Sequence, residues 1–271
     1  MRLWQPFNLR AGALFLATGV GLFLYFRHER DQIAARKAAE SANSKVGRPR
    51  IGGPFELTMA VPAGKGKAQG YRVTHDDIEG AFSLIYFGFT NCPDICPEEL
   101  DKMGDVVDAI GEWQDAGSTV TKIANIDEIC SVPPSDSSHG QIINPIFISC
   151  DPARDSLPLV STYISDFHPR LVGLTGAYEA VKQACKSYRV YFSTPPNADP
   201  KGDYLVDHSI FFYLMDPEGR FVDAFGRSAG KEEVEKKVRG YVEKWKAEGL
   251  PLGKADLKQR VSSDESRKVD A

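Results

Sequence analysis

The chain has no excess of positive charge, few cysteines and no internal repeat. Its 271 residues carry 33 Lys and Arg against 37 Asp and Glu, a formal net charge of −4. This composition lacks the basic footprint of nucleic-acid binding, so we expect no nucleic-acid partner. Five cysteines are too few and too scattered for a disulfide scaffold, and an odd number leaves at least one thiol unpaired within the chain. They are Cys92, Cys96, Cys130, Cys150 and Cys185.

A stretch near the N-terminus is apolar enough to enter a membrane. Residues 11–26 carry no charge, and as a helix they span about 24 Å against a hydrocarbon core of roughly 30 Å. We predict a single transmembrane anchor at 11–26, preceded by a short segment at 1–10. A cleaved signal peptide is the alternative, but the run 27–31 that follows is charged and offers no small-residue cleavage site.

Changes in composition divide the rest of the chain. Residues 27–50 are rich in Ala, Glu, Lys and Arg, which predicts a polar tether. Residues 51–247 have the alternating and helical patterns of one domain. Within it, the long polar segment 114–144 is unusual for a compact domain and suggests an insertion. Residues 248–271 are polar, and we expect them to be disordered.

The order of predicted elements indicates an α/β fold. The apolar runs 82–89 and 145–150 predict strands buried on both faces, and a helical pattern follows each. Residues 208–215 and 220–225 predict an antiparallel hairpin joined by a type I turn at 216–219. A last helical pattern follows the hairpin. The expected architecture is a mixed sheet flanked by helices.

The strongest chemical signal is the pair Cys92 and Cys96, at the end of the first buried strand. Pro97 and two glutamates after it mark the first turn of a helix. A helix N-terminus carries free N–H groups and a partial positive charge, so a thiol there ionises more readily. A cysteine pair at this position is the thioredoxin arrangement, with three intervening residues instead of two. Because a thiolate is both a nucleophile and a soft metal ligand, redox chemistry and metal binding both remain open.

Metal binding by this pair requires at least one further ligand. Structural zinc prefers four ligands, so two thiolates leave a zinc site incomplete. Cu(I) accepts fewer and softer ligands, and two Cys with one His complete a trigonal site. His208, at the mouth of a predicted strand, is the best-placed candidate, although a surface or sheet histidine is the commoner interpretation from the residues alone. The other histidines have no comparable placement: His28, His75, His139 and His168.

The remaining cysteines have simpler interpretations. Cys130 lies in the predicted insertion and is expected to be a loop thiol. Cys185 falls on the apolar face of a predicted helix, as a small buried residue. Cys150 ends the strand expected to run parallel to 82–89, so it could lie near the Cys92–Cys96 pair, although a packing role is favoured.

Six segments in chain order resemble the Sco/SenC family of cytochrome c oxidase assembly proteins. They are GGPF (52–55), YFGFTNCPDICPEEL (86–100), DPARD (151–155), LVGLTG (171–176), YRVY (188–191) and VDH (206–208). The resemblance implies a thioredoxin-like domain tethered to a membrane. It also implies that Cys92, Cys96 and His208 bind Cu(I), which is delivered to the binuclear copper centre of cytochrome c oxidase subunit II.

The same resemblance implies further partners and a location. Copper is expected from a small soluble metallochaperone, and the cysteines are expected to undergo thiol–disulfide exchange as an auxiliary reductase activity. The expected location is the mitochondrial inner membrane, with the large domain in the intermembrane space. Lys and Arg are more numerous after the anchor than before it, so the positive-inside rule alone would leave the domain inside. No long Arg/Ser-rich transit sequence precedes the anchor, which leaves three alternatives: import uses the anchor region, the predicted start is truncated, or the protein sits in a bacterial plasma membrane.

Two other functions fit the cysteine pair. One is a thiol–disulfide oxidoreductase or thiol peroxidase with Cys92 as the attacking thiol, and the other is a copper or redox sensor. His208 discriminates, because metal transfer needs a third ligand and simple dithiol exchange does not. A homodimer is left open. The sequence departs from the family pattern in the long 114–144 segment and at Cys150, where relatives commonly carry an aliphatic residue.

Overall fold

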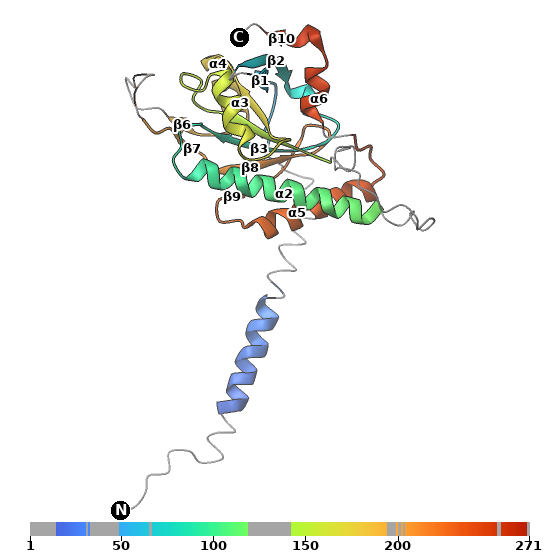
Figure 1. Ribbon diagram of the computed structural model, residues 1–271. Helices are drawn as coiled ribbons and strands as arrows, with labels where there is room; N and C mark the ends of the chain where they lie inside the picture. The colour runs from blue at the N-terminus through green and yellow to red at the C-terminus, as the bar shows by residue number, and fades with distance from the viewer. Residues whose placement is uncertain are drawn as a thin grey trace, which may run out of the picture. The chain divides into compact units, whose positions relative to one another are not determined.

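The computed structural model describes residues 15–30, 32, 49–64, 67–118, 142–193, 199, 202, 204–253 and 256–269 (Figure 1). The chain divides into two compact units, Met1–Pro49 and Arg50–Ala271. In the first unit, residues 15–30 are helical and their large apolar side chains are exposed. Among the described residues, no helix has the length and apolar character needed to cross a bilayer. Residues 11–14 of the predicted anchor lie outside the described residues, so the anchor stays a prediction.

The second unit is built on an eight-stranded mixed sheet, which confirms the predicted architecture. The strand order is β10-β2-β1-β5-β4-β3-β8-β9. The central strands β3, β4 and β5 are parallel, and the outer pairings are antiparallel. The strands are β1 (Glu56–Pro62), β2 (Ala68–Thr74), β3 (Phe82–Gly88), β4 (Ile143–Ser149), β5 (Val172–Thr175), β8 (Phe211–Met215), β9 (Phe221–Gly226) and β10 (Lys268–Val269).

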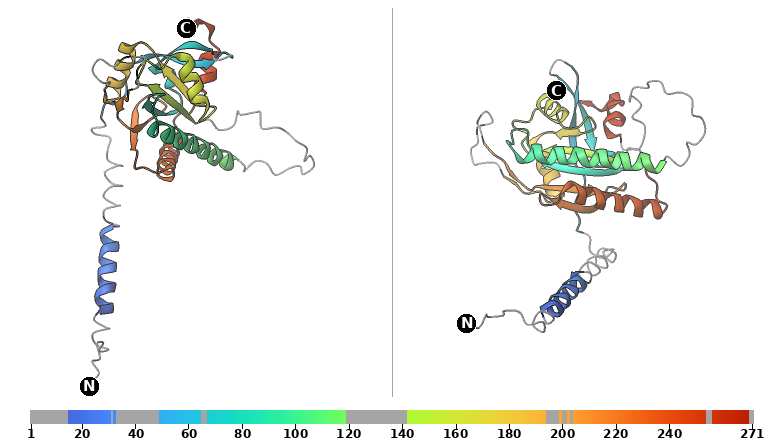
Figure 2. Two further views of the ribbon diagram at one scale, coloured as in Figure 1. Left: turned by 60° about the vertical axis from the view of Figure 1, so that its left-hand side comes forward. Right: turned by 60° about the horizontal axis from the view of Figure 1, so that its bottom comes forward.

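Helices cover both faces of this sheet. They are α2 (Ile95–Ser118), α3 (Leu157–Ser165), α4 (Tyr178–Ser187), α5 (Lys231–Ala247) and α6 (Leu257–Ser262), with 3-10 turns η1 (His75–Ile78) and η3 (Glu265–Arg267). Helices α2 and α5 lie side by side along one face in all views (Figures 1 and 2). A separate two-stranded ladder pairs β6 (Phe192–Ser193) with β7 (Asp207–His208).

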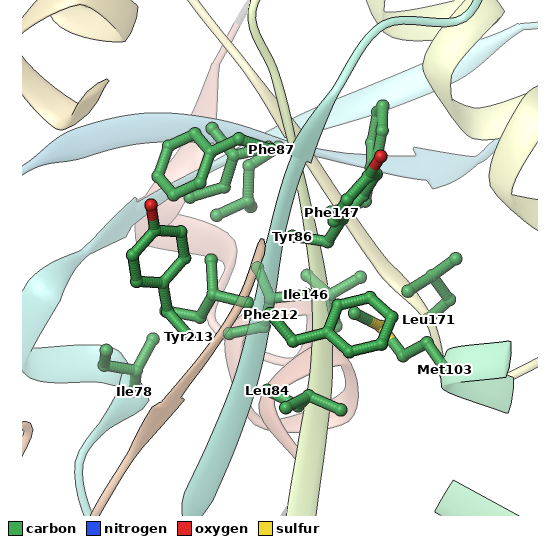
Figure 3. Close-up of a cluster of buried hydrophobic side chains, with 14 of the residues drawn as sticks. Ile78, Leu84, Tyr86, Phe87, Met103, Ile146, Phe147, Leu171, Phe212 and Tyr213 are labelled. Atoms are coloured by element: carbon green, nitrogen blue, oxygen red, sulfur yellow. The ribbon is translucent and has the colours of Figure 1, made fainter. Parts of the chain in front are cut away.

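Every residue of β3 and β4 is buried, which explains the continuous apolar runs that predicted them. Because side chains alternate along a strand, Tyr86 and Phe87 point to opposite faces. Tyr86 reaches Cys96 on α2, whereas the Phe87 ring packs 5.3 Å from that of Tyr188, which follows α4. Figure 3 shows Phe87 with Tyr213 on one side of β3, and Tyr86 on the other. The sheet therefore divides the core into two layers. Helix α2, which carries Cys96, packs on the face of the sheet to which Tyr86 points.

Two predicted boundaries were wrong. Residues 248–271 were expected to be disordered, but Leu257 and Val261 of α6 are each 1% exposed, and β10 pairs with β2. Apolar residues at helical spacing in an otherwise polar tail bury themselves against η1 and β2, and the average composition hides them. The predicted insertion was also too wide, because α2 continues to Ser118 and β4 begins at Ile143. The remainder of the insertion, with Cys130 and His139, lies outside the described residues, as do most of the tether and several residues of the tail.

Candidate metal and thiol site

The cysteine pair lies where β3 ends and α2 begins, as predicted. Residues 89–94, here called the cysteine loop, connect the buried strand to Ile95, the first residue of α2. Cys96 is the second residue of this helix and is fully buried, while Cys92 in the loop is partly exposed. Both thiols are free. The four-residue spacing therefore produces one accessible thiol and one protected thiol.

Cys92 has the character of a thiolate. The Cys96 thiol donates a hydrogen bond to the Cys92 sulfur and, against the opposing effect of burial, lowers the pKa of Cys92 to about 5. The backbone N–H of Cys96 also donates to Cys92 Sγ at 3.4 Å. The N–H groups of Ile95 and Cys96 both lower the pKa of Cys92 and belong to the first turn of α2, so the helix N-terminus stabilises the negative sulfur. At neutral pH, Cys92 is ready to act as a nucleophile or a soft ligand.

Cys96 keeps its proton in this arrangement. Its hydrogen bond to Cys92 and its burial both raise the pKa of the Cys96 thiol. The buried hydroxyl of Tyr86 donates to Cys96 Sγ at 3.6 Å, within the range expected for sulfur. Ionisation of the pair is therefore divided between an outer thiolate and an inner thiol.

His208 reaches the same place from a distant part of the chain. Its Nε2 lies 3.5 Å from Cys96 Sγ, and its Nδ1 lies 3.1 Å from the carbonyl oxygen of Ser209. A carbonyl oxygen only accepts, so Nδ1 carries the proton and the Nε2 lone pair faces the sulfur. Burial lowers the pKa of His208 and favours the neutral ring. The rings of Tyr86 and Phe89 pack edge-on against the imidazole, with centroids 6.0 and 5.8 Å away.

The structure thus brings Cys96 and His208 into contact and places Cys92 beside Cys96. In the part of the chain that the structure describes, no three His, Cys, Asp or Glu side chains already converge as a ready-made metal cluster. The strand expected at 208–215 is divided: His208 belongs to the short β7, and β8 begins at Phe211.

The other cysteines and histidines make different contacts, although Cys150 lies close enough to the pair for Cys96 to contribute to its raised pKa, and its N–H donates to the Gly88 carbonyl at the end of β3. Cys150 and Cys185 are buried together, and the hydrogen bond between them, with burial, raises the pKa of Cys150. His168 is buried and its Nε2 lies 3.0 Å from Asp108 Oδ1, while its Nδ1 accepts from the Arg170 N–H. These contacts tie His168 to α2 and to the segment just before β5, and they do not involve the cysteine pair.

Sequence reasoning missed the residues that fix the site. Tyr86 was assigned only to a buried strand, although it donates to Cys96. The turn at 151–155 carried the family resemblance, but its contacts could not be predicted: Asp155 accepts hydrogen bonds from Thr90 in the cysteine loop, and Asp151 accepts one from the Tyr204 hydroxyl. The sequence did offer one signal for these contacts: two carboxylates and an arginine lie within 151–155, directly after a predicted buried strand.

Comparison with known proteins places the chain in a family. The SCO1/SenC family model matches residues 43–243. The chain belongs to the SCO1/SenC family. Protein sco1 of Schizosaccharomyces pombe is 45% identical over 235 residues, covering 86% of this chain and 76% of that protein. The mitochondrial protein SCO1 of Saccharomyces cerevisiae is 47% identical over 237 residues, covering 86% of this chain and 69% of that protein.

A solved structure of this family supports the fold assignment. The crystal structure of yeast Sco1 with copper bound is 46% identical and has a TM-score of 0.56, covering 72% of this chain and 90% of that one. The mixed sheet flanked by helices is thus the thioredoxin-like fold of SCO1/SenC proteins, with the cysteine pair at the thioredoxin position.

Proposed function

We propose that this SCO1/SenC protein is a copper chaperone of cytochrome c oxidase assembly that carries Cu(I) on Cys92, Cys96 and His208. The observation that supports this most is the 3.5 Å approach of His208 Nε2 to Cys96 Sγ, with the lone pair of a neutral imidazole on that side. A dithiol oxidoreductase has no need of this contact. The yeast Sco1 crystal structure with copper bound supports copper as the cargo.

The donor set fits Cu(I). Two thiolate sulfurs and one imidazole nitrogen are soft and borderline ligands. With bond lengths like those of zinc sites, about 2.0 Å to nitrogen and 2.3 Å to sulfur, a trigonal angle separates N and S by about 3.7 Å. The observed 3.5 Å between Cys96 and His208 is close to that value. Binding must release the Cys96 proton, so copper loading is linked to pH as well as to the reduced state of the thiols.

The acceptor, donor and location follow from the family. We propose delivery to the binuclear copper centre of oxidase subunit II, loading by a small soluble metallochaperone, and a mitochondrial inner-membrane location facing the intermembrane space. The mitochondrial SCO1 of Saccharomyces cerevisiae supports the organelle. A single anchor at 11–26 is retained as part of the proposal, because residues 15–26 are helical with exposed apolar side chains.

A second activity, thiol–disulfide exchange, is favoured by the Cys92 thiolate. A partly exposed thiol whose pKa is lowered to about 5 attacks disulfides at neutral pH. The buried Cys96 then resolves the mixed disulfide, leaving a Cys92–Cys96 disulfide and a reduced partner. This chemistry does not require His208, so the two activities are separable.

The test is Cu(I) binding by the reduced full chain, measured by competition with a chromophoric Cu(I) chelator. We expect one Cu(I) per wild-type chain. Altering even an outer partner of a metal ligand costs about 10–100-fold in affinity, so His208→Ala should lose at least about 100-fold. His28→Ala, which changes an exposed histidine of the other unit, is the matched control. Absence of Cu(I) uptake by the wild type, or equal Cu(I) affinity in His208→Ala, would refute the proposal. The second activity is tested by the rate of thiol–disulfide exchange in His208→Ala, which should equal that of the wild type.

A further inference from the structure

The turn at 151–155, between β4 and α3, touches both segments that carry the proposed ligands. At one end, Asp155 is 1% exposed and holds the cysteine loop. Its carboxylate accepts from the Thr90 backbone N–H at 3.1 Å and from the Thr90 hydroxyl at 2.6 Å. It also accepts from Ser149 Oγ at 2.6 Å, at the end of β4. Thr90 stands two residues before Cys92, so the cysteine loop is fixed to the central sheet.

The other end of the turn holds the segment that leads to His208. Asp151 Oδ1 accepts from the Tyr204 hydroxyl at 2.9 Å, and Asp151 Oδ2 accepts from Arg154 Nε at 2.5 Å. The Arg154 guanidinium lies 3.5 Å from the Tyr204 ring centroid, a close cation–π stack. Arg154 Nη1 also donates to the Gly202 carbonyl at 3.4 Å. Residues 204–208, here called the histidine segment, are thus attached four residues before His208.

Arg154 also supports the His208 imidazole indirectly, through the Phe89 ring. Its guanidinium lies 5.9 Å from the Phe89 ring, and that ring packs 5.8 Å from the His208 ring at an interplanar angle of 88°. By comparison, β7 has weak support of its own, since it is two residues long and pairs with the equally short β6. The histidine segment is held by Val206, which is 4% exposed in the core, and by the contacts of Tyr204 with the side chains of the 151–155 turn.

A purely structural role explains these contacts less well. Arg154 and Asp151 side chains are 6% and 2% exposed. Buried ion pairs are poor stabilisers, because desolvation costs about as much as the attraction returns. Here the Asp151–Arg154 pair contacts a segment that lies outside the main sheet and leads to the proposed ligand His208.

We propose that the 151–155 turn is a two-ended positioning bridge. Asp155 fixes the cysteine loop, and Asp151 with Arg154 holds Tyr204, and through it His208, against Cys96. The two ends use different side chains, so the histidine segment can loosen while the cysteine loop stays in place. This inference deepens the proposed copper function and rests on it.

The experiment uses two substitutions of Tyr204 in the full chain. Tyr204→Leu removes the ring stack and the hydroxyl, whereas Tyr204→Phe removes only the hydroxyl. Tyr241→Leu, at a tyrosine of α5 whose hydroxyl also donates to a carboxylate, that of Asp223, is the matched control. Hydrogen exchange of the metal-free chain is followed at two amides: Ser209, which donates to Tyr191 beyond the histidine segment, and Cys150, which donates to Gly88 beside the cysteine loop. Release of Cu(I) to a chelator is measured on the loaded chains.

Supporting partners of metal ligands typically matter by about 10–100-fold, so we expect Tyr204→Leu to raise both Ser209 exchange and Cu(I) release about tenfold or more. Cys150 exchange should not change, Tyr204→Phe should be intermediate, and Tyr241→Leu should match the wild type at both amides. Equal acceleration of both amides would show a merely structural role and overturn the proposal, as would an unchanged Ser209 amide in Tyr204→Leu and Tyr204→Phe. If the wild type takes up no Cu(I), the proposed function fails, and the exchange rates still decide whether the bridge exists.

Discussion

The division of ionisation between Cys92 and Cys96 can be tested directly. The structure attributes the low Cys92 pKa, about 5, first to the hydrogen bond from the Cys96 thiol and then to backbone N–H groups at the start of α2. Replacing Cys96 with Ala removes the first donor and leaves the backbone donors. Replacing it with Ser keeps a donor in nearly the same place. The two substitutions therefore separate the side-chain hydrogen bond from the helix N-terminus.

The size of the effect follows from the value of one hydrogen bond to a charged group. Such a bond contributes about 1.5–3 kcal/mol, and 1.36 kcal/mol corresponds to one pH unit. Cys92 is partly exposed, so solvent screening favours the lower end of that range. We expect the ionisation midpoint to rise by about one pH unit in Cys96→Ala and to stay within about half a unit in Cys96→Ser.

The assay is the rate of Cys92 alkylation by iodoacetamide from pH 4 to pH 9, with the modified residue identified by mass spectrometry. Only the thiolate reacts, so the rate follows ionisation. Cys150 and Cys185 are buried and should stay unmodified in the folded chain. A wild-type midpoint near 8.5, the value of an ordinary thiol, would refute the assignment of Cys92 as the thiolate. Identical midpoints in Cys96→Ala and Cys96→Ser would refute the role of the Cys96 hydrogen bond.

Two predictions concern the fold. Leu257→Ala in α6 should lower the free energy of unfolding by about 2–5 kcal/mol, whereas Leu159→Ala, at a residue 40% exposed, should cost much less. Equal values in urea titrations would mean that the C-terminal helix is not part of the core. His75 is half-buried, its Nδ1 has no hydrogen-bond partner among the described residues, and desolvation lowers its pKa, opposed by Glu79 and Asp76. The folded chain then binds fewer protons than the unfolded chain, so stability should fall below pH 6.5, by at most about 1.4 kcal/mol per pH unit, and His75→Gln should reduce that loss.

The parts of the fold that could be predicted are those whose burial is uniform along the chain. Strand β3 is buried at every residue and α2 follows it without a long connection, so periodicity and the N-terminal signals at Pro97 were sufficient. The tail was different. Leu257 and Val261 are two apolar residues in a polar segment, and their burial depends on η1 and β2, which lie almost two hundred residues earlier. The composition of the tail contains no information about packing partners that lie so far away in the sequence.

The site shows the same limit. Cys92 and Cys96 could be recognised from the sequence, because their spacing, Pro97 and the predicted strand–helix junction all lie within one short stretch. His208 is 112 residues from Cys96. Its strand-end position made it the best-placed histidine, but only the family resemblance favoured a ligand over a surface or sheet histidine before the structure placed the two side chains 3.5 Å apart. Tyr86 could not be assigned a role, since a tyrosine in a buried strand looks the same whether its hydroxyl meets a sulfur or a backbone carbonyl.

The arrangement explains how one site could both carry copper and respond to oxidation. Copper transfer needs a thiolate that a partner can reach, and Cys92 is partly exposed with a lowered pKa. Under the proposed function, retention needs ligands shielded from water: Cys96 is fully buried, and His208 is partly buried. Closing a disulfide removes two electrons and the Cys96 proton from the same two sulfurs, so an oxidised chain keeps only the imidazole as a ligand. Under the proposed function, Cu(I) is then carried only while the pair is reduced, and the partly buried, neutral His208 adds affinity without adding a second redox-active group.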